Sequence, residues 1–259
     1  MRSMPTVSII TPSLNQGEFI GECLESVRAA AAAAGISVEH LVVDGGSTDQ
    51  TLDILGKQNH ARWISEKDRG QADAINKGLA QTSGEIVSYL CADDMLEPEA
   101  LRLVLSAFED GVDVVYGDAF FLESGWKRRK FARDFSPSRL RKENFLLQPA
   151  VFLRRSVFEK FGAFDASLHF CIDHEFWLRI SEATKWKHVA SPLACSRLHS
   201  DAKTWSQLPE AWDEARKMQA RYGIYWRPLR DAIWMKTAGC HYYRIKRILF
   251  ALIAKSRKP

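Results

Sequence analysis

The sequence predicts an α/β fold with a mainly parallel sheet and helices on both of its faces. Short apolar runs of strand length alternate with helix-length stretches through the first half of the chain. Polar turns rich in glycine and aspartate separate these segments. Repeated βα units of this size imply parallel strands, because each helix crosses over the sheet and returns the chain to start the next strand in the same direction.

The expected elements follow one another without a low-complexity linker or an internal repeat. Strands are expected at 7–11, 40–43, 62–66, 86–90 and 112–116. Helices are expected from about 18 to 34, up to 55, from 72 to 81 and from 98 to 108. Gly35 follows the first helix, at the position where glycine commonly ends one.

The second half of the chain adds a helix at 173–182, with one apolar stripe, and a strand at 193–196. The pattern then changes, and two helices are expected at about 209–222 and 229–254. We therefore expect one α/β domain over residues 1–204 and a helical C-terminal appendage over residues 205–259, which need not fold independently.

The last expected helix combines aromatic and aliphatic side chains with a basic face. An amphipathic helix of this kind suits the surface of an anionic membrane. The same stripe would also fit packing against the first domain or against a partner subunit in a homodimer. The sequence leaves these alternatives open.

Composition excludes several classes of function. The formal net charge of +4 is too small to indicate nucleic-acid binding. The five cysteines are scattered without a Cys-x-x-Cys pair, which favours free thiols in a reducing compartment over disulfides or a zinc site. Neither a signal peptide nor an apolar stretch of about 20 residues is visible. A cytoplasmic location is expected, with peripheral contact to the inner face of the cytoplasmic membrane as an option.

The most informative stretch is the apolar run that ends in Asp93 and Asp94. Adjacent carboxylates repel each other and raise one pKa unless a cation or a donor-rich ligand lies between them. A hard divalent metal that also binds substrate phosphates would resolve this conflict. The alternative is a surface turn that caps the helix beginning near Pro98.

Other polar residues leave the carboxyl ends of the predicted strands, where open α/β sheets bind ligands. They are Thr11, Asn15, Asp44, Asp68, Arg69, Asp93 and Asp94. Acids suit ribose hydroxyls, base N–H groups or a metal, whereas helix N-termini suit phosphates. The set predicts a nucleotide–metal site. The Asp44 loop alone is a weak signal, because Ser47 or Asp49 could simply cap the next helix.

Two common nucleotide-binding motifs are absent from the sequence. No Gly-x-x-x-x-Gly-Lys-Ser/Thr segment is present, which disfavours a P-loop nucleotidase. The turn after the first strand also lacks Gly-x-Gly-x-x-Gly, which disfavours a dinucleotide-binding dehydrogenase. A nucleotide would be held mainly through its base, its ribose and a metal.

The ordered motifs resemble family 2 glycosyltransferases of the GT-A fold, closest to bacterial members that build surface polysaccharides. The motifs are VSIITPSLN from position 7, VVDGGSTDQT from 42, SEKDRGQADAINKG from 65, GEIVSYLCADD from 84, QPAVF from 148, FGAFD from 161 and DHEFWLR from 173. The resemblance covers roughly residues 5–200. It implies transfer of a sugar from a nucleotide sugar with inversion, usually with Mn2+ or Mg2+.

The resemblance assigns roles to the donor-side residues. It implies that Thr11 and Pro12 line the nucleobase pocket and that Asp44 accepts the base N–H. Arg69 would lie near the base or the diphosphate, Asp93 would hold the ribose or the sugar, and Asp94 would ligate the metal. Cys91 stands where this subgroup often has asparagine, and cysteine is a poor ligand for a hard ion.

Inversion in one displacement requires a carboxylate that takes the proton of the acceptor hydroxyl. Asp173 is the candidate, because it lies in the matched motif at the start of an expected helix. Relatives often have Glu-Asp here, but Ile172 precedes Asp173 in this chain. The alternative is that Asp173 only caps the helix, and Glu175 is the substitute candidate for the base.

Relatives place a histidine or basic residue near the end of the matched region, which implies a metal–diphosphate role for His199. The loop around it is expected to close over the donor, with Lys203 near the leaving diphosphate. The basic run at Trp126–Lys130 predicts either a solvated hairpin or a surface for an acidic acceptor or membrane headgroups.

Taken together, the sequence predicts an inverting glycosyltransferase that uses a nucleotide sugar, expected to be a UDP-sugar. The expected acceptor is a growing, lipid-linked bacterial glycan. Nucleotidyl transfer is disfavoured, because no Gly-rich loop with arginine and lysine follows the first strand. The alternative from another class is a catalytically inactive nucleotide-sugar sensor or membrane scaffold.

Overall fold

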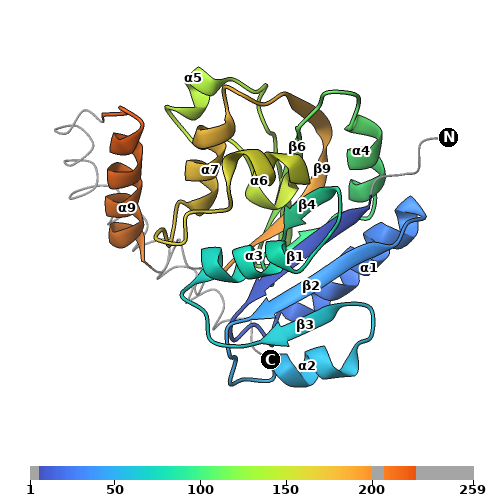
Figure 1. The fold of residues 1–259 in the computed structure, drawn as a ribbon. Coiled ribbons are helices and arrows are strands. Elements are labelled where there is room, and N and C mark those ends of the chain that lie inside the picture. The colour runs from blue at the N-terminus through green and yellow to red at the C-terminus, as the bar shows by residue number, and fades with distance from the viewer. Residues whose placement is uncertain (1–5, 200–206, 226–259) are drawn as a thin grey trace.

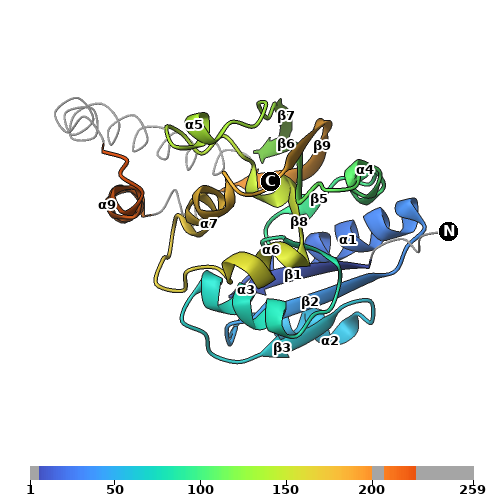
Figure 2. The same cartoon turned by 45° about the horizontal axis from the view of Figure 1, so that its top comes forward.

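The computed structural model describes residues 6–199 and 207–225 and contains one mixed β-sheet flanked by helices (Figures 1 and 2). The nine strands of this described part lie in the order β3-β2-β1-β4-β8-β6-β9-β5, and β7 pairs with β6 beside this path. The prediction of an α/β fold is confirmed.

The first four βα units form the parallel half of the sheet. Strand β1 (Val7–Ser13) pairs in parallel with β2 (Val38–Asp44) and with β4 (Ile86–Tyr89), and β2 pairs in parallel with β3 (Arg62–Ser65). Thus the carboxyl ends of these strands meet at one edge of the sheet. The connecting helices are α1 (Ile20–Ala34), α2 (Thr51–Lys57) and α3 (Gln71–Ala80).

The second half of the sheet is mixed. Strand β8 (Val151–Arg154) runs antiparallel between β4 and β6 (Val114–Glu123). The long strand β9 (Trp186–Leu198) lies parallel to β6 and antiparallel to β5 (Met95–Leu96), while β7 (Trp126–Lys130) forms a hairpin with β6. The sequence did not indicate β5, which has only two residues, or β8, which is defined by antiparallel pairing with β4 and β6, segments that lie far from it along the chain.

Helices cover both faces of the sheet, as predicted. One face packs against α3, α6 (Arg155–Phe161) and α7 (Ile172–Ile180), and the other against α1 and α4 (Ala100–Ala107) (Figures 1 and 2). The remaining elements are α5 (Pro137–Leu140), the 3-10 helix η1 (Gln148–Ala150) and α9 (Leu208–Arg221).

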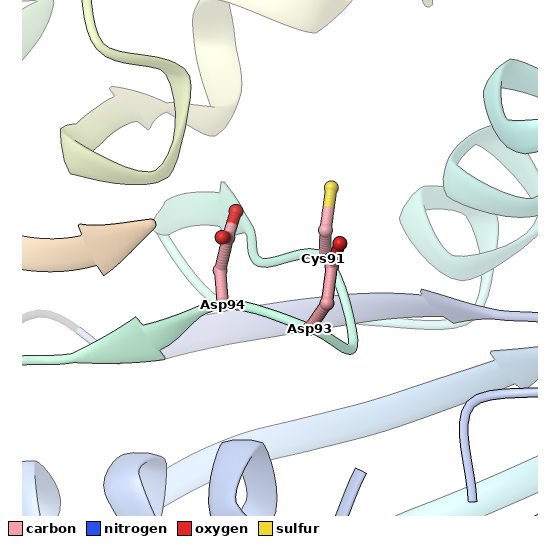
Figure 3. A group of neighbouring side chains, drawn as sticks. All are labelled: Cys91, Asp93 and Asp94. Carbon is pink, nitrogen blue, oxygen red and sulfur yellow. The ribbon is translucent and has the colours of Figure 1, made fainter. Parts of the chain in front are cut away.

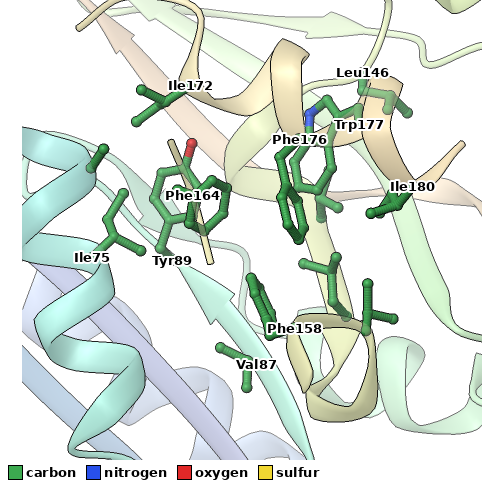
Figure 4. Packing of buried hydrophobic residues seen from close by; sticks show 14 of the residues in the cluster. Ile75, Val87, Tyr89, Leu146, Phe158, Phe164, Ile172, Phe176, Trp177 and Ile180 are labelled. Atoms are coloured by element: carbon green, nitrogen blue, oxygen red, sulfur yellow. The ribbon is translucent and has the colours of Figure 1, made fainter. Parts of the chain in front are cut away.

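The largest buried cluster lies between the sheet and α7 and is rich in aromatic rings. Figure 4 shows Tyr89 beside Phe164, with the tyrosine hydroxyl pointing towards Ile172 at the start of α7. The rings of Tyr89 and Phe164 meet edge to face at 5.4 Å, and Phe176 and Trp177 are fully buried. Burial of such large rings contributes strongly to stability. The cluster therefore holds α7 firmly above the end of β4.

Helix α9 belongs structurally to the described α/β body. Met218 is fully buried within the same cluster, and Arg221 pairs with Asp165 at 2.8 Å. This helix matches the expected one at 209–222, which the sequence assigns to the C-terminal appendage. The second expected helix, at 229–254, lies outside the described residues.

The described part of the chain bears on two expectations, one about membrane-spanning helices and one about the state of the cysteines. None of its helices is both long and apolar enough to cross a membrane. The four cysteines that it includes, Cys23, Cys91, Cys171 and Cys195, are free thiols.

Candidate active site

The loop after β2 is organised by Asp44, whose side chain is fully buried. Its carboxylate accepts hydrogen bonds from the backbone N–H groups of Gly46 at 3.0 Å and Ser47 at 2.8 Å. The hydroxyl groups of Ser65, at 2.7 Å, and of Ser47 also donate to it. Asp44 therefore holds the ends of β2 and β3 together, and a base N–H would have to join these donors.

Asn15 connects this loop to the end of β1. Its side-chain oxygen accepts the backbone N–H of Thr48 at 2.9 Å, and its own N–H donates to Ser47 at 2.7 Å. Asn15 adopts a positive φ of 52°, a conformation that asparagine tolerates better than most residues. Its exposed side chain lies at the sheet edge where the donor is expected.

Ser47 and Asp49 form hydrogen bonds between the loop after β1 and the loop after β2. Asp49 accepts the backbone N–H groups of Gly17 and Thr51, each at 2.9 Å. The capping alternative for Asp49 thus holds in part, because Thr51 begins α2, although Gln50 occupies the cap position itself. Both residues fix the two loops against each other.

Thr11 is fully buried, and its hydroxyl lies 2.9 Å from Nε2 of His40. Burial lowers the pKa of His40 to about 3, with a smaller contribution from His60. The Thr11 side chain is therefore occupied inside the protein. Any contact of Thr11 or the buried Pro12 with a nucleobase would use the backbone or the proline ring.

This buried pair predicts acid sensitivity. The folded protein excludes a proton from His40, whereas the unfolded chain accepts one below pH 6.5, so stability is present at neutral pH and is lost as pH falls towards 3. By pH 5 we expect a loss of about 2 kcal/mol from this group. Urea unfolding at pH 7 and pH 5 should show that difference in wild type and not in His40→Gln. An equal pH dependence in both proteins would contradict the prediction.

Arg69 lies just before α3 and is held by the side chain of Asp73. Its guanidinium donates to Asp73 at 2.7 Å, and its side chain is 80% exposed. The guanidinium is therefore accessible at the sheet edge, although its charge is already paired.

The loop after β4 gathers three ligand-type side chains. The Cys91 thiol and the carboxylates of Asp93 and Asp94 place one ligand atom each within 4.8 Å of the others. Figure 3 shows Cys91 and Asp94 pointing to the same side of the loop. Asp93 and Asp94 do not cap α4, because Glu99 occupies its cap position.

Asp94 is the buried member of this group, with 6% exposure. Burial raises its pKa to about 8, and the neighbouring charge of Asp93 adds to the rise. The backbone N–H of Arg197 donates to Asp94 at 3.0 Å and opposes the shift. Two carboxylates with this conflict suit a hard divalent cation, which takes oxygen ligands. Asp93 and Asp94 thus form a candidate metal site.

Cys91 does not suit the same ion. Burial and the nearby charges of Asp94 and Asp93 raise the pKa of its thiol well above the ordinary value, so it stays protonated at neutral pH. Its sulfur accepts from the side-chain nitrogen of Gln71 at 3.0 Å and lies 3.8 Å from Oε1 of Gln148. We therefore assign no metal-binding role to Cys91.

The end of β9 packs against the two acids. The Arg197 guanidinium donates to the backbone oxygen of Asp93 at 3.3 Å and to Glu22 at 2.8 Å. Nε2 of His199 lies 3.0 Å from the Asp93 carboxylate, and its ring lies 4.8 Å from that of Phe19. His199 thus reaches the candidate metal site through Asp93. Lys203 and the loop expected to close over the donor lie outside the described residues.

Asp173 lies in the first turn of α7 but does not cap it, because Cys171 occupies the cap position. The side-chain nitrogen of Asn144 donates to its carboxylate at 3.0 Å. Burial, followed by the charges of Asp173, Cys91 and Asp94, raises the pKa of Tyr89 well above its ordinary value. Asp173 and Asp94 therefore act on the same tyrosine at the end of β4.

Glu175, the substitute candidate for the general base, is already bound by other side chains of the protein. Its carboxylate is 8% exposed and pairs with Arg179 at 2.6 Å. The hydroxyl of Tyr222 also donates to it at 2.5 Å. This acid ties α7 to the end of α9, which leaves Asp173 as the accessible carboxylate of the helix.

Sequence reasoning missed Glu214, which lies on α9. Its carboxylate accepts the backbone N–H groups of His169 at 2.7 Å, Phe170 at 2.6 Å and Cys171 at 3.0 Å. Although burial opposes it, these bonds lower the pKa of Glu214. A distant residue thus fixes the segment that leads into Asp173. No motif marks it, because the contact spans more than 40 residues.

Comparison with known sequences identifies the family. The sequence pattern of glycosyl transferase family 2 matches residues 8–181. An uncharacterized glycosyltransferase of Mycobacterium tuberculosis is 32% identical over 185 residues, which cover 69% of this chain and 70% of the relative. A PGL/p-HBAD biosynthesis glycosyltransferase of Mycobacterium bovis is 30% identical over 197 residues, covering 71% of this chain and 75% of the relative.

Solved structures support the same fold. S. aureus TarS (residues 1–349, in complex with UDP-GlcNAc) matches with a TM-score of 0.69 and 19% identity. The match covers 82% of this chain and 65% of the TarS chain. The mannosyltransferase PcManGT from Pyrobaculum calidifontis, in complex with GDP-Man and Mn2+, matches with a TM-score of 0.64 and 16% identity. That match covers 100% of this chain and 77% of the PcManGT chain. The expected GT-A-like architecture is confirmed. The chain therefore belongs to glycosyl transferase family 2 and is a glycosyltransferase.

Proposed function

We propose that this enzyme transfers a sugar, with inversion, from a UDP-sugar to a hydroxyl of a lipid-linked bacterial glycan. The observation that carries the proposal is the pair of carboxylates, Asp93 and Asp94, at the carboxyl end of β4, of which the buried Asp94 accepts the Arg197 N–H. Asp94 lies in the candidate metal site after β4, and the Tyr89 hydroxyl at the end of β4 points towards Ile172, the residue before Asp173 in α7 (Figure 4). In this proposal Asp94 serves the leaving diphosphate and Asp173 the attacking hydroxyl.

The donor would lie along the carboxyl ends of β1, β2 and β4. We propose that Thr11, Pro12, Asn15, Asp44, Arg69 and Asp93 line its site. Asp44 and Asn15 supply oxygen atoms there, and Arg69 supplies an exposed cation. The UDP-GlcNAc complex of TarS and the GDP-Man complex of PcManGT support a nucleotide-sugar donor in this fold.

Asp93 and Asp94 would hold Mn2+ or Mg2+, with His199 beside Asp93. Such an ion, when bound, neutralises the charge that develops on the departing diphosphate. Mn2+ in the PcManGT complex supports this assignment. The chain itself supplies the buried carboxylate of Asp94 and the Arg197 N–H that orients it.

Asp173 would act as the general base in a single displacement. As the acceptor oxygen forms a bond to the anomeric carbon, the bond from that carbon to the diphosphate oxygen breaks. The hydroxyl proton passes to the carboxylate of Asp173, and the nucleoside diphosphate leaves with the bonding electrons. Asn144 orients the carboxylate through its 3.0 Å hydrogen bond.

A thermal-shift screen tests the donor assignment. UDP-, GDP- and dTDP-sugars are compared with and without Mn2+ on the full chain. We expect the largest stabilisation with a UDP-sugar and Mn2+ together, since a ligand at 100 times its Kd stabilises by about 2.7 kcal/mol. A larger shift with a GDP- or dTDP-sugar would overturn the choice of nucleotide.

Glu214 provides a separate prediction about the base. Because Glu214 fixes residues 169–171, Glu214→Ala should loosen Asp173 and lower kcat by about tenfold while donor Kd stays unchanged. Glu214→Gln keeps one acceptor oxygen and should recover part of the rate. Single-turnover rates and donor titrations measure the two effects, and a kcat equal to wild type in Glu214→Ala would contradict the prediction.

A further inference from the structure

The β6–β7 hairpin carries a basic and aromatic surface that the proposed reaction does not use. Side chains alternate along β7, so Trp126, Arg128 and Lys130 share one face of the strand. We call these three residues the open face of β7. They extend over about 13 Å, given the rise of a β-strand.

The opposite face of the hairpin is already neutralised. Lys127 pairs with Glu97 at 2.7 Å, and Arg129 pairs with the buried Asp118 at 2.6 Å. By contrast, within residues 6–199 and 207–225, Arg128 and Lys130 form no ion pair with another described residue. Arg128 only lies over the ring of Phe121, at 5.9 Å. The open face thus keeps two cations for an external anion.

An exposed aromatic ring accompanies these cations. Trp126 is 75% exposed. Phe131, which is 66% exposed, is not part of this face, because the Arg129 guanidinium of the opposite face lies over its ring at 4.7 Å. Exposed rings of this size next to unpaired cations are typical of contacts with the membrane interface, where the ring enters the headgroup layer and the cations meet lipid phosphates. The mild net charge of +4 does not favour nucleic acid as the partner.

The hairpin also lies next to the candidate active site. Its turn joins Glu123 to Trp126, and Glu123 pairs in register with Leu198 of β9. The residues on either side of Leu198 contact the two acids: the Arg197 N–H donates to Asp94, and His199 lies against Asp93. A membrane bound at this hairpin would therefore lie close to the site of transfer.

We propose that the open face of β7 docks the enzyme on an anionic lipid surface. Arg128 and Lys130 contact lipid phosphates, and Trp126 enters the headgroup layer. Glu123 opposes Trp126 in register and is the one acid on this face of the hairpin pairing. The link between docking and a lipid-linked acceptor rests on the proposed function, whereas the docking itself does not.

Vesicle co-sedimentation of the full chain tests the proposal. Vesicles of phosphatidylcholine alone are compared with vesicles that also contain phosphatidylglycerol. We expect wild type to bind only the anionic vesicles, and less as salt increases. Arg128→Glu/Lys130→Glu should bind at least about tenfold more weakly, since each basic residue near an anionic surface contributes about 1 kcal/mol.

A matched control and a second readout complete the test. Lys57→Glu/Arg102→Glu has the same change in net charge on α2 and α4 and should bind like wild type. Brominated lipids should quench part of the tryptophan emission of wild type but less in Trp126→Phe.

Two outcomes would overturn the proposal. Binding of the β7 variant equal to wild type would assign the contact to other residues, and a failure of wild type to bind anionic vesicles would exclude the docking itself. Donor binding in the thermal-shift screen is independent of either result, which separates this failure from failure of the proposed function.

Discussion

Asp173→Asn is expected to lower kcat by about 10²–10⁴-fold while leaving donor binding intact. The amide still accepts the hydrogen bond from Asn144, so the start of α7 keeps its geometry, but it cannot take up the acceptor proton. General-base catalysis accounts for about 10²–10⁴ in rate, and kcat should fall within that range. Product formation under saturating donor and acceptor measures kcat, and isothermal titration measures donor Kd.

The control for this prediction is Glu182→Gln. Glu182 follows α7, is exposed, and loses the same negative charge when it is replaced by glutamine. Its kcat should match wild type. A near-normal rate in Asp173→Asn would remove Asp173 from the role of base, and Glu175 is a poor replacement because Arg179 and Tyr222 engage it.

Asp94→Asn is expected to abolish metal-dependent donor binding together with transfer. Asparagine keeps an oxygen that accepts the Arg197 N–H, so the loop is preserved, but the anionic ligand is lost. Titration of the donor with and without Mn2+ should show a metal effect in wild type and none in the variant. Turnover should fall below detection.

The folding stability of the same variant distinguishes a lost ligand from a damaged fold. The pKa of Asp94 is raised to about 8, so the folded state favours the protonated acid, and stability falls as pH rises from 3.8 to about 8. Asparagine lacks this penalty. Without added metal at pH 7, Asp94→Asn should therefore unfold at the same temperature as wild type or higher. A lower Tm would show that Asp94 supports the fold instead.

Several features were predictable because they depend on local sequence. The apolar runs that became β1, β2 and β4 pack on both faces, and this burial makes their pattern continuous and easy to recognise. The turn after β4 placed Asp93 and Asp94 correctly at the edge of the sheet. The order of motifs was enough to identify the family that the comparisons confirm.

Other features depended on contacts between distant segments. Arg197 reaches Asp94 across 103 positions, and Glu214 reaches Cys171 across 43. The sequence alone did not distinguish Thr11 and Glu175 from Asp173 as side chains that are free to contact a ligand. The structure separates them, because the partners of Thr11 and Glu175 lie on other elements and occupy their polar atoms.

The sequence by itself determined the α/β class, the family and the acids that follow β4, because these follow from local patterns of burial and from adjacent charges. Only the tertiary structure decided which polar groups are committed to the fold and which remain accessible. It also decided that α9 supports α7 and that, among the described residues, Arg128 and Lys130 on one face of β7 have no ion-pair partner. The physical reason is that hydrogen bonds and ion pairs are satisfied in space, between segments whose separation along the chain carries no signal.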